Sequence, residues 1–178
     1  MVEHDDSILV RQCLDGNRSK FGDLVGKYTK PVYNLALRMV GDAEDAADIT
    51  QATFIKAYEN LGKFDLTLKF FSWLYRIGIN ESLNFLQKKK QKEPLDDELV
   101  SNDGSPEHAL YEAERSEIIQ HAIMKLTPEQ RSVIVLRHFM DLNYTQMGMT
   151  LGITESKVKA RLFSARQRLR KMLVNKGL

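Results

Sequence analysis

The chain contains 178 residues, 43% of them hydrophobic, and its formal net charge is +2. This length is enough for one or two small domains with hydrophobic cores. The single cysteine, Cys13, excludes a disulfide framework or a cysteine-based zinc site within one chain, and its apolar neighbours favour a place in the core. No apolar run approaches the roughly 20 residues of a membrane span. The acidic start lacks the basic region of a signal peptide, so we expect a soluble, cytoplasmic protein.

Helical periodicity runs through nearly the whole sequence and predicts an all-α protein. The first predicted helix covers residues 6–14. The second covers residues 19–40 and is expected to be interrupted at Pro31, because proline lacks a backbone donor and disfavours helix for the residue before it. Asp42 is expected to cap a third helix over residues 43–61, whose acidic first turn favours the helix dipole. Its core-facing residues are expected to be Ile49, Phe54, Ile55 and Tyr58.

A loop over residues 62–71, rich in aromatic side chains, leads into a fourth helix over residues 72–90 with Ser72 as its N-cap. Aromatics near lysines can stack unpaired bases, but Phe64 and Trp73 are expected to pack in the core. Polar residues recur every four positions along this helix and share one face. Their side chains can bond base edges and phosphates, although such a stripe is also typical of a solvated face. The stripe consists of Ser72, Arg76, Asn80, Asn84 and Lys88.

Composition changes after the fourth helix. Residues 93–104 are acidic, contain Pro94 and have few large apolar groups, which predicts a flexible linker. We therefore expect two small helical domains, residues 1–92 and residues 105–178. The second domain should open with a helix over residues 106–125.

Clear start and stop signals mark the next two helices. A capping box with proline at the first helical position predicts a helix over residues 128–139. A second reciprocal cap, at Asn143, predicts a helix over residues 144–151. Gly152 can end that helix, because glycine tolerates left-handed backbone geometry at little cost.

The last predicted helix, residues 155–174, is capped by Thr154 and strongly basic. From Ser156 to Leu178 there are eight Lys and Arg residues and no Asp or Glu. A short helix, a turn and a basic helix are typical of a helix-turn-helix, whose second helix enters a DNA groove. A solvated basic terminal helix is the alternative. The face opposite the apolar one carries Lys157, Lys159, Arg161, Phe163, Ser164, Arg166 and Arg170.

No motif points to catalysis. The sequence contains no glycine-rich phosphate loop and no HExxH zinc motif, and Asp96-Asp97 lies in the predicted linker, where no pocket could raise a pKa. We expect no enzyme activity, no cofactor and no metal site. The histidines, which show no ligand spacing on one helix, are His4, His108, His121 and His138.

Taken together, these segments resemble the extracytoplasmic-function (ECF) sigma factors of bacterial RNA polymerase, in the sigma-70 family. The resemblance covers roughly residues 6–92 and 105–175, and its most specific motifs are DAEDAADITQATF, FSWLYRIGIN and VKARLFSARQRL. It implies a region 2 helical bundle, an acidic linker and a region 4 helix-turn-helix. It also implies promoter recognition and DNA melting with core polymerase, in a stress or envelope response.

The resemblance further implies roles for single residues. The third helix resembles the surface that docks on the coiled coil of the polymerase's largest subunit, through Asp45, Asp48, Gln51 and Lys56. The loop and the fourth helix resemble the reader and melter of the minus-ten promoter element, through Lys63, Lys69, Phe70, Phe71, Arg76, Asn80, Asn84 and Lys88. The last helix resembles the reader of the minus-thirty-five element, through Thr154, Ser156, Lys157, Lys159, Arg161, Phe163 and Arg166.

The partners implied are core RNA polymerase (coiled coil and flap), promoter DNA and an anti-sigma factor, with the free chain a monomer. The anti-sigma factor is expected to cover the exposed apolar loop residues Leu66, Leu68 and Phe70. Two departures stand out. Leu66-Thr67-Leu68 replaces small polar residues of the melting loop, and Gly148 replaces an alanine of the bracing helix, at a cost of about 1 kcal/mol.

Two other functions are compatible with the residues alone. One is an autonomous helix-turn-helix regulator that binds DNA without polymerase, which would normally need a dimer interface that the sequence does not show. The other is a helical adaptor whose basic face binds an acidic protein. Co-purification separates the three, because it would recover polymerase subunits, DNA alone or another protein.

Overall fold

The computed structural model describes residues 3–92 and 107–174, and every regular element within these two ranges is helical. The predicted all-α fold is therefore confirmed. The predicted linker over residues 93–104 and the first residue of the helix expected over residues 106–125 lie outside the described residues. Among the described helices, none is both long and apolar enough to cross a bilayer.

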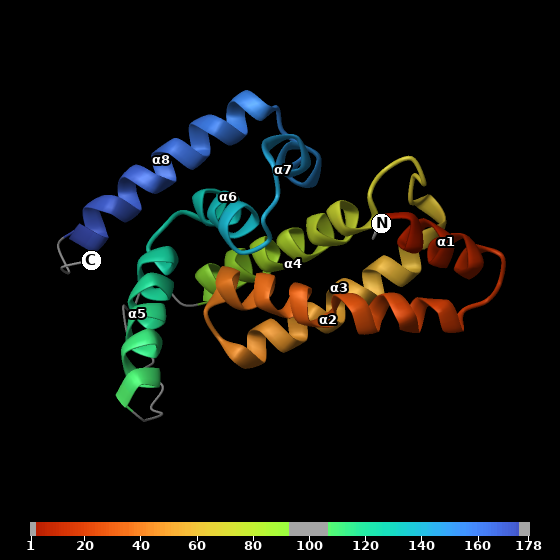
Figure 1. Ribbon diagram of the computed structural model, residues 1–178, viewed down its shortest axis with the longest axis horizontal. Helices are drawn as coiled ribbons and strands as arrows, with labels where there is room; N and C mark the ends of the chain where they lie inside the picture. The colour runs from red at the N-terminus through yellow and green to blue at the C-terminus, as the bar shows by residue number, and fades with distance from the viewer. Residues whose placement is uncertain (1–2, 93–106, 175–178) are drawn as a thin grey trace.

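The N-terminal half is a helical bundle built around α2. Its elements are α1 (Glu3–Leu14), α2 (Ser19–Val40), α3 (Ala43–Asn60), the short 3-10 helix η1 (Leu61–Lys63) and α4 (Phe70–Lys92). α2 packs against α1, α3 and α4, and α3 also packs against α4 (Figure 1). Each helix turns one apolar face inward. The fully buried side chains include Val10, Leu24, Val32, Leu35, Met39, Leu74 and Ile79.

The expected interruption at Pro31 is wrong, because α2 continues through it. Proline removes one backbone hydrogen bond and crowds the preceding turn. Here Tyr28 and Val32 bury the same face on either side of the proline, and Leu35 continues that face. Tertiary packing therefore outweighs the local cost at Pro31.

The expected cap at Ser72 is also wrong. α4 begins at Phe70, and Ser72 lies buried inside its first turn. The ring of Phe70 is only 3% exposed, so its burial draws the helix start two residues earlier than the polar signal at Ser72. By contrast, the predicted cap at Asp42 is confirmed, because its carboxylate accepts hydrogen bonds from the backbone N–H groups of Glu44 and Asp45 at 2.9 Å each.

The C-terminal half consists of α5 (Glu107–Met124), α6 (Pro128–His138), α7 (Tyr144–Leu151) and α8 (Glu155–Val174). Both predicted capping boxes are confirmed, one at Thr127 with Gln130 and one at Asn143 with Gln146. α8 packs against α5, α6 and α7. The fully buried side chains of this half include Ile123, Val133, Leu136, Met147 and Leu162.

Two glycines shape the turn between α7 and α8. Gly152 has φ +65° and ends α7 in the left-handed geometry that the sequence predicted. A Cβ atom at Gly148 would lie only 2.8 Å from the carbonyl oxygen of Ile153. Gly148 therefore allows close approach of the turn to α7, a gain that offsets its low helix propensity.

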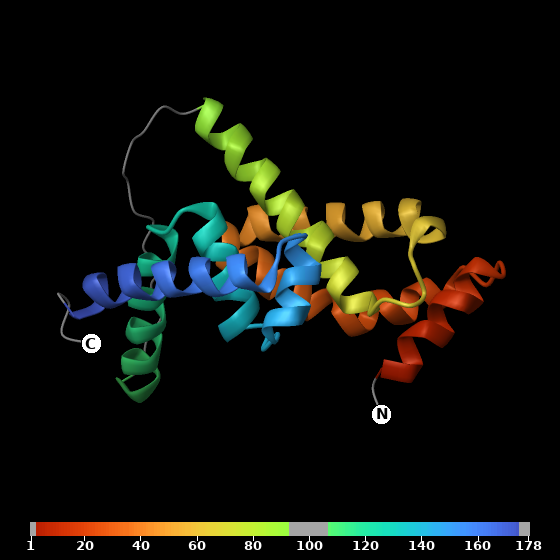
Figure 2. The ribbon, with the colours of Figure 1, turned by 90° about the horizontal axis from the view of Figure 1, so that it is seen from above.

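The two halves lie against one another. α7 packs against α4, while α5 and α6 pack against α2. Figures 1 and 2 show α7 beside the first turns of α4, with α8 on the far side of α7 from the N-terminal bundle. The predicted minus-ten helix and the helix-turn-helix are thus neighbours in space.

Candidate nucleic-acid and polymerase interfaces

α8 is held in a fixed orientation by α6 and α7. Gln130, at the start of α6, donates from Nε2 to Oγ of Ser164 at 2.9 Å. Thr145, on α7, donates to the carboxylate of Glu155 at 2.6 Å. The inward face of α8 buries Val158, Leu162 and Ala165. This packing leaves the opposite face of a basic helix turned outward, which is the arrangement that a groove-reading helix needs.

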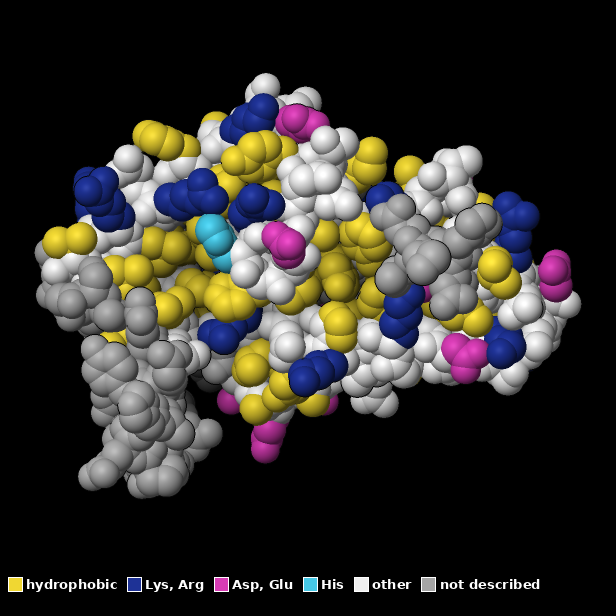
Figure 3. Space-filling model, viewed as in Figure 1, with side chains coloured by type: hydrophobic (Ala, Val, Ile, Leu, Met, Phe, Trp, Pro, Cys, Tyr) yellow, Lys and Arg dark blue, Asp and Glu magenta, His cyan; other side chains and the backbone are white. Residues whose placement is uncertain are grey.

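The side chains predicted to read the minus-thirty-five element gather on that outer face. Thr154 caps the helix by accepting from the N–H of Lys157 at 3.3 Å. Phe163 is 67% exposed, and an apolar ring at this position can contact the methyl group of thymine. Lys and Arg side chains lie along α8 in Figure 3. Arg161 is half-buried, and the exposed residues are Thr154, Ser156, Lys157, Lys159, Phe163 and Arg166.

Two cations of this face are oriented by partners within the protein. Nζ of Lys159 lies 3.9 Å from the carboxylate of Glu155 and 5.4 Å from the ring centre of Tyr144. Nη2 of Arg166 lies 3.3 Å from Nε2 of His138. Burial, followed by the positive charges of Arg166 and Arg137, lowers the pKa of His138. The neutral imidazole can then accept from Arg166.

No sequence pattern indicates a role for His138. It lies 28 residues from Arg166, and α6 and α8 meet only through tertiary packing. No local pattern predicts a pair of this separation. The structure adds His138 as a residue that orients one of the predicted DNA contacts.

The predicted polar stripe of α4 is exposed on one face of the helix, except at its first member. Ser72 is buried, and its hydroxyl has no hydrogen-bond partner among the described residues. The opposite face of the helix is anchored in the bundle by Leu74, Tyr75 and Ile79. The exposed members of the stripe are Arg76, Asn80, Asn84 and Lys88.

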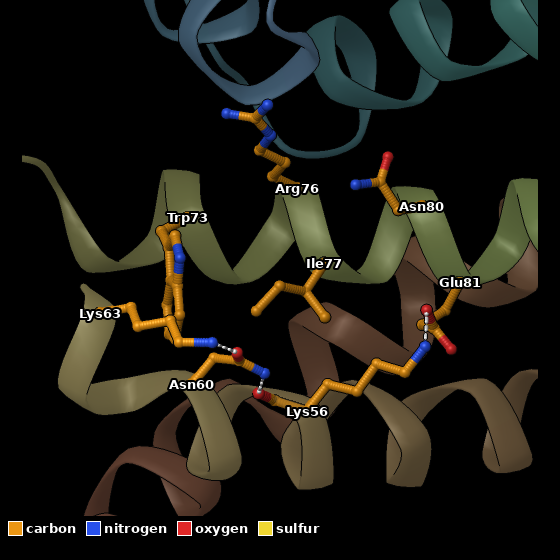
Figure 4. Close-up of a pocket in the computed structure, with 8 residues that line it drawn as sticks. All are labelled: Lys56, Asn60, Lys63, Trp73, Arg76, Ile77, Asn80 and Glu81. Carbon is orange, nitrogen blue, oxygen red and sulfur yellow. Dashed lines mark hydrogen bonds and ion pairs between the residues drawn. The ribbon is translucent and has the colours of Figure 1, made fainter. Parts of the chain in front are cut away.

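An open pocket of about 350 Å³ lies beside this stripe, between α3, η1 and α4 (Figure 4). Lys56 closes one end through an ion pair of 2.5 Å with Glu81. Lys63 donates to Asn60 at 3.3 Å on the opposite side. The pocket thus combines apolar surface with cationic and amide groups. Its lining residues are Lys56, Asn60, Lys63, Trp73, Arg76, Ile77, Asn80 and Glu81.

Phe70 is buried, whereas its predicted contacts with minus-ten DNA and an anti-sigma factor require an exposed ring. Its ring is buried, 5.7 Å from the ring centres of Tyr28, Phe64 and Trp73. It cannot stack a base in this position, and it is not one of the exposed apolar residues that an anti-sigma factor could cover. Burying a large aromatic surface is favourable. Because α4 begins at Phe70, the ring of Phe70 can pack against the bundle and contribute this stabilisation. The packing roles expected for Phe64 and Trp73 agree with these contacts.

The rest of the loop is shaped by an Asx-type turn. The carboxylate of Asp65 accepts from the N–H of Thr67 at 2.9 Å and from its hydroxyl at 2.7 Å. These hydrogen bonds lower the pKa of Asp65. Leu66 is half-buried against the core, whereas Leu68 is 46% exposed. Phe71 is half-buried, and Lys69 lies 6.0 Å from its ring centre.

The four residues predicted to dock on polymerase lie on α3 but not on one common face. Asp45 forms an ion pair of 3.4 Å with Lys89, and Lys56 is held by α4 at the pocket described above. Asp48 and Gln51 are exposed. The structure therefore brings Asp48 and Gln51 together on the outer face and turns Asp45 and Lys56 toward α4.

Two apolar residues occupy the same outer face. The sequence placed Ile55 and Tyr58 in the core of the bundle, and that placement is wrong, because they are 51% and 43% exposed. Helical spacing contained the signal, since Asp48, Gln51 and Ile55 follow each other by three and four residues. We define the α3 face as Asp48, Gln51, Ile55 and Tyr58.

No metal chemistry is suggested by the described residues, in which no three His, Cys, Asp or Glu side chains lie close enough to hold an ion. Cys13 is partly buried on α1 and packs against the core. Burial raises the pKa of its thiol above the ordinary value. A protonated thiol is a poor nucleophile, which agrees with the packing role expected from the sequence.

Both halves of the chain match models of known protein families. Residues 24–92 match the family model for sigma-70 region 2, and residues 122–171 match the model for sigma-70 region 4. The ECF RNA polymerase sigma factor SigW of Bacillus subtilis (strain 168) is 36% identical over 176 residues, which cover 92% of this chain and 94% of SigW. The RNA polymerase sigma-H factor of Pseudomonas aeruginosa is 31% identical over 186 residues, covering 97% of this chain and 96% of that factor.

Similarity extends to a solved structure, that of CnrH in complex with the cytosolic domain of CnrY. It matches with a TM-score of 0.74 and 26% identity over 96% of this chain and 97% of that one. The two family models fall on the two halves, and the relatives align over nearly their full length. The chain therefore belongs to the extracytoplasmic-function family of sigma-70 sigma factors.

Proposed function

We propose that this chain binds core RNA polymerase and directs it to promoters, with α8 reading the minus-thirty-five element and α4 opening the minus-ten element. Sigma factors are non-enzymatic initiation factors, in agreement with the absence of a catalytic motif. The observation that carries the proposal is that one chain has two different surfaces whose side chains suit nucleic acid. One is the capped, basic outer face of α8, and the other is the polar stripe of α4 beside its pocket. Residues 1–92 and 105–178 would act as the two corresponding domains.

The outer face of α8 suits duplex DNA. Its N-terminal end is exposed and carries short polar and cationic side chains, which can reach base edges when this end enters the major groove. Arg166 lies two turns further along the helix, where a cation meets phosphates rather than bases. Because the phosphate contacts carry no sequence information, the choice of promoter would rest on the residues from Ser156 to Phe163.

The pocket beside α4 suits unpaired DNA. A base turned out of the stack presents both an apolar face and hydrogen-bonding edges. The pocket offers Trp73 and Ile77 for the first, and Asn80 on the adjoining stripe of α4 can bond the second. Lys63 at the rim can meet the strand's phosphates. Opening would be favoured because these contacts are available only to a base that has left the duplex.

The α3 face is the proposed docking surface for the polymerase coiled coil. Its two exposed apolar residues are surrounded by polar and acidic ones, which is the composition of an interface core with a polar rim. The same exposed apolar groups, together with Leu68, suit coverage by an anti-sigma factor. The matched structure of CnrH is itself a complex, with the cytosolic domain of CnrY. We infer that regulation of this kind would place the chain in a stress or envelope response.

Run-off transcription with core polymerase and a promoter library tests the proposal. Transcripts from a subset of promoters, dependent on the added chain, are expected. Duplex binding of the same promoters should be measured with and without core enzyme. If the chain alone selects promoters and core enzyme adds neither affinity nor transcripts, the chain is an autonomous regulator and the proposal fails.

A further inference from the structure

The first helix, α1, places one acidic side chain inside the N-terminal bundle. Asp6 is only 5% exposed. Its carboxylate accepts hydrogen bonds from Nζ of Lys27 and from the hydroxyl of Tyr28, the latter at 2.5 Å. A buried carboxylate is costly unless it is paired and hydrogen-bonded, so these two donors on α2 explain how Asp6 is kept in the bundle. α1 precedes residues 24–92, the segment that matches the region 2 model.

The ring of Tyr28 belongs to a continuous aromatic cluster. The centre of this ring lies 5.7 Å from the ring centre of Phe70, and the rings of Phe70 and Trp73 are also 5.7 Å apart. Phe64 packs beside both, 5.7 Å from Phe70 and 5.1 Å from Trp73. Trp73 lines the open pocket, and Figure 4 shows its side chain extending from α4 toward η1. Ring contacts therefore connect the acidic side chain of α1 to the wall of the pocket.

The buried hydroxyl of Tyr28 relies on Asp6 as its acceptor. Burial, followed by the hydrogen bond to Asp6 and the negative charge of Asp6, raises the pKa of Tyr28, so the hydroxyl stays protonated and needs an acceptor. A buried hydroxyl that loses its acceptor bears the full cost of its desolvation. The ring can avoid that cost by turning its hydroxyl toward water, and this movement would remove the support that Tyr28 gives to Phe70.

We propose that Asp6 is a positioning residue for the pocket, because by accepting from Tyr28 it fixes the aromatic cluster and with it the orientation of Trp73. A ring that is already ordered before a base arrives lowers the cost of binding that base. The ion pair with Lys27 balances the charge of the carboxylate, whereas the orientation of the cluster depends on the hydroxyl bond. The link from Asp6 to Trp73 follows from these contacts alone, but its effect on promoter opening rests on the base-binding role proposed for the pocket.

Trp73 is the only tryptophan of the sequence, so its fluorescence reports directly on the cluster. In the full chain, Asp6→Ala should increase the quenching of Trp73 by acrylamide and shift its emission to longer wavelength. Adding Tyr28→Phe to Asp6→Ala should return both values toward those of the unmodified chain, because removal of donor and acceptor together leaves no buried hydroxyl unpaired. Lys27→Gln removes the charge but leaves the hydroxyl bond, so this matched control should change neither value.

The variants are compared at a temperature at which circular dichroism shows them folded. Fluorescence that Asp6→Ala leaves unchanged, or that Lys27→Gln changes equally, would overturn the positioning role. A change that the added Tyr28→Phe does not reverse would also overturn it, because Asp6 would then only anchor α1. If Asp6→Ala alone does not fold, the double variant should restore the fold, and its failure to do so would count against the role in the same way.

Promoter opening is measured separately, as permanganate reactivity at the minus-ten element with core polymerase and promoters recovered by run-off transcription. Asp6→Ala should reduce opening at least about threefold, the factor that corresponds to one hydrogen bond, and the double variant should restore it. Altered fluorescence with undiminished opening would overturn the contribution of this contact to opening. If the unmodified chain with core enzyme opens no promoter, the proposed function fails, and the fluorescence still decides whether Asp6 fixes Trp73.

Discussion

Replacing Ile55 by alanine should weaken binding to core polymerase while leaving the fold intact. Ile55 is 51% exposed, so about half of its side chain is available to a partner. Burying a whole isoleucine side chain is worth about 1.5–3 kcal/mol, and half of that is about 1 kcal/mol, or roughly fivefold in Kd. The loss of stability should be smaller than the 2–5 kcal/mol typical of a core Ile→Ala change, because the exposed half creates no cavity.

The chain supplies a matched control. Ile8, on α1, is 47% exposed and lies outside the α3 face, so Ile8→Ala removes a similar apolar surface without touching the proposed interface. Competition between each variant and a fluorescent unmodified chain for a fixed amount of core enzyme gives the two affinities, and urea unfolding gives the two stabilities. Equal affinities for Ile55→Ala and Ile8→Ala would refute the α3 face as the docking surface, whatever their common value.

Three further predictions address the DNA faces and one tertiary contact. Arg166→Ala should weaken DNA binding about equally on all promoters and lower the salt dependence of log K by roughly one ion. Lys159→Ala should instead reduce the binding free energy by about 1–3 kcal/mol on the preferred sequence only. An equal loss of affinity on all sequences for both variants would contradict the assignment of Arg166 to phosphates and Lys159 to bases. Asn80→Ala with Asn84→Ala should reduce permanganate reactivity at the minus-ten element and leave minus-thirty-five binding unchanged. If promoter opening is undiminished in this variant, the polar stripe of α4 is only a solvated face. Since the folded pKa of His138 lies below its ordinary 6.5, the unfolded chain binds more protons between the two values, and stability should fall as pH drops below about 6.5. His138→Gln should flatten this part of the profile of unfolding free energy against pH, and an unchanged slope would show that other groups cause it.

Local chemistry predicts most of the fold. The caps at Asp42, Thr127 and Asn143 are each fixed by hydrogen bonds between residues two or three positions apart, so short sequence patterns identify them. The left-handed residue at Gly152 follows for the same reason. These features needed no knowledge of the tertiary structure.

The errors occur where distant packing decides. Ser72 carries a good cap signal, but the burial of Phe70 against Tyr28 sets the helix start. Ile55 belongs to an apolar cluster in the sequence, yet it lies about 100° around α3 from the buried Phe54 and faces outward. The number of apolar residues in a helix does not show which of them face the core, whereas the angular position of each residue around the helix axis does.

The position of the α3 face bears on the order in which partners can bind. Asp48, Gln51 and Ile55 are exposed while α7 lies on α4, and α3 packs against α2, α4 and η1 rather than against α7. Core polymerase can therefore bind the proposed α3 face without displacing the C-terminal half. Docking would change the arrangement of the two halves only through a difference in affinity for two arrangements, because a partner that bound both equally would not shift the equilibrium.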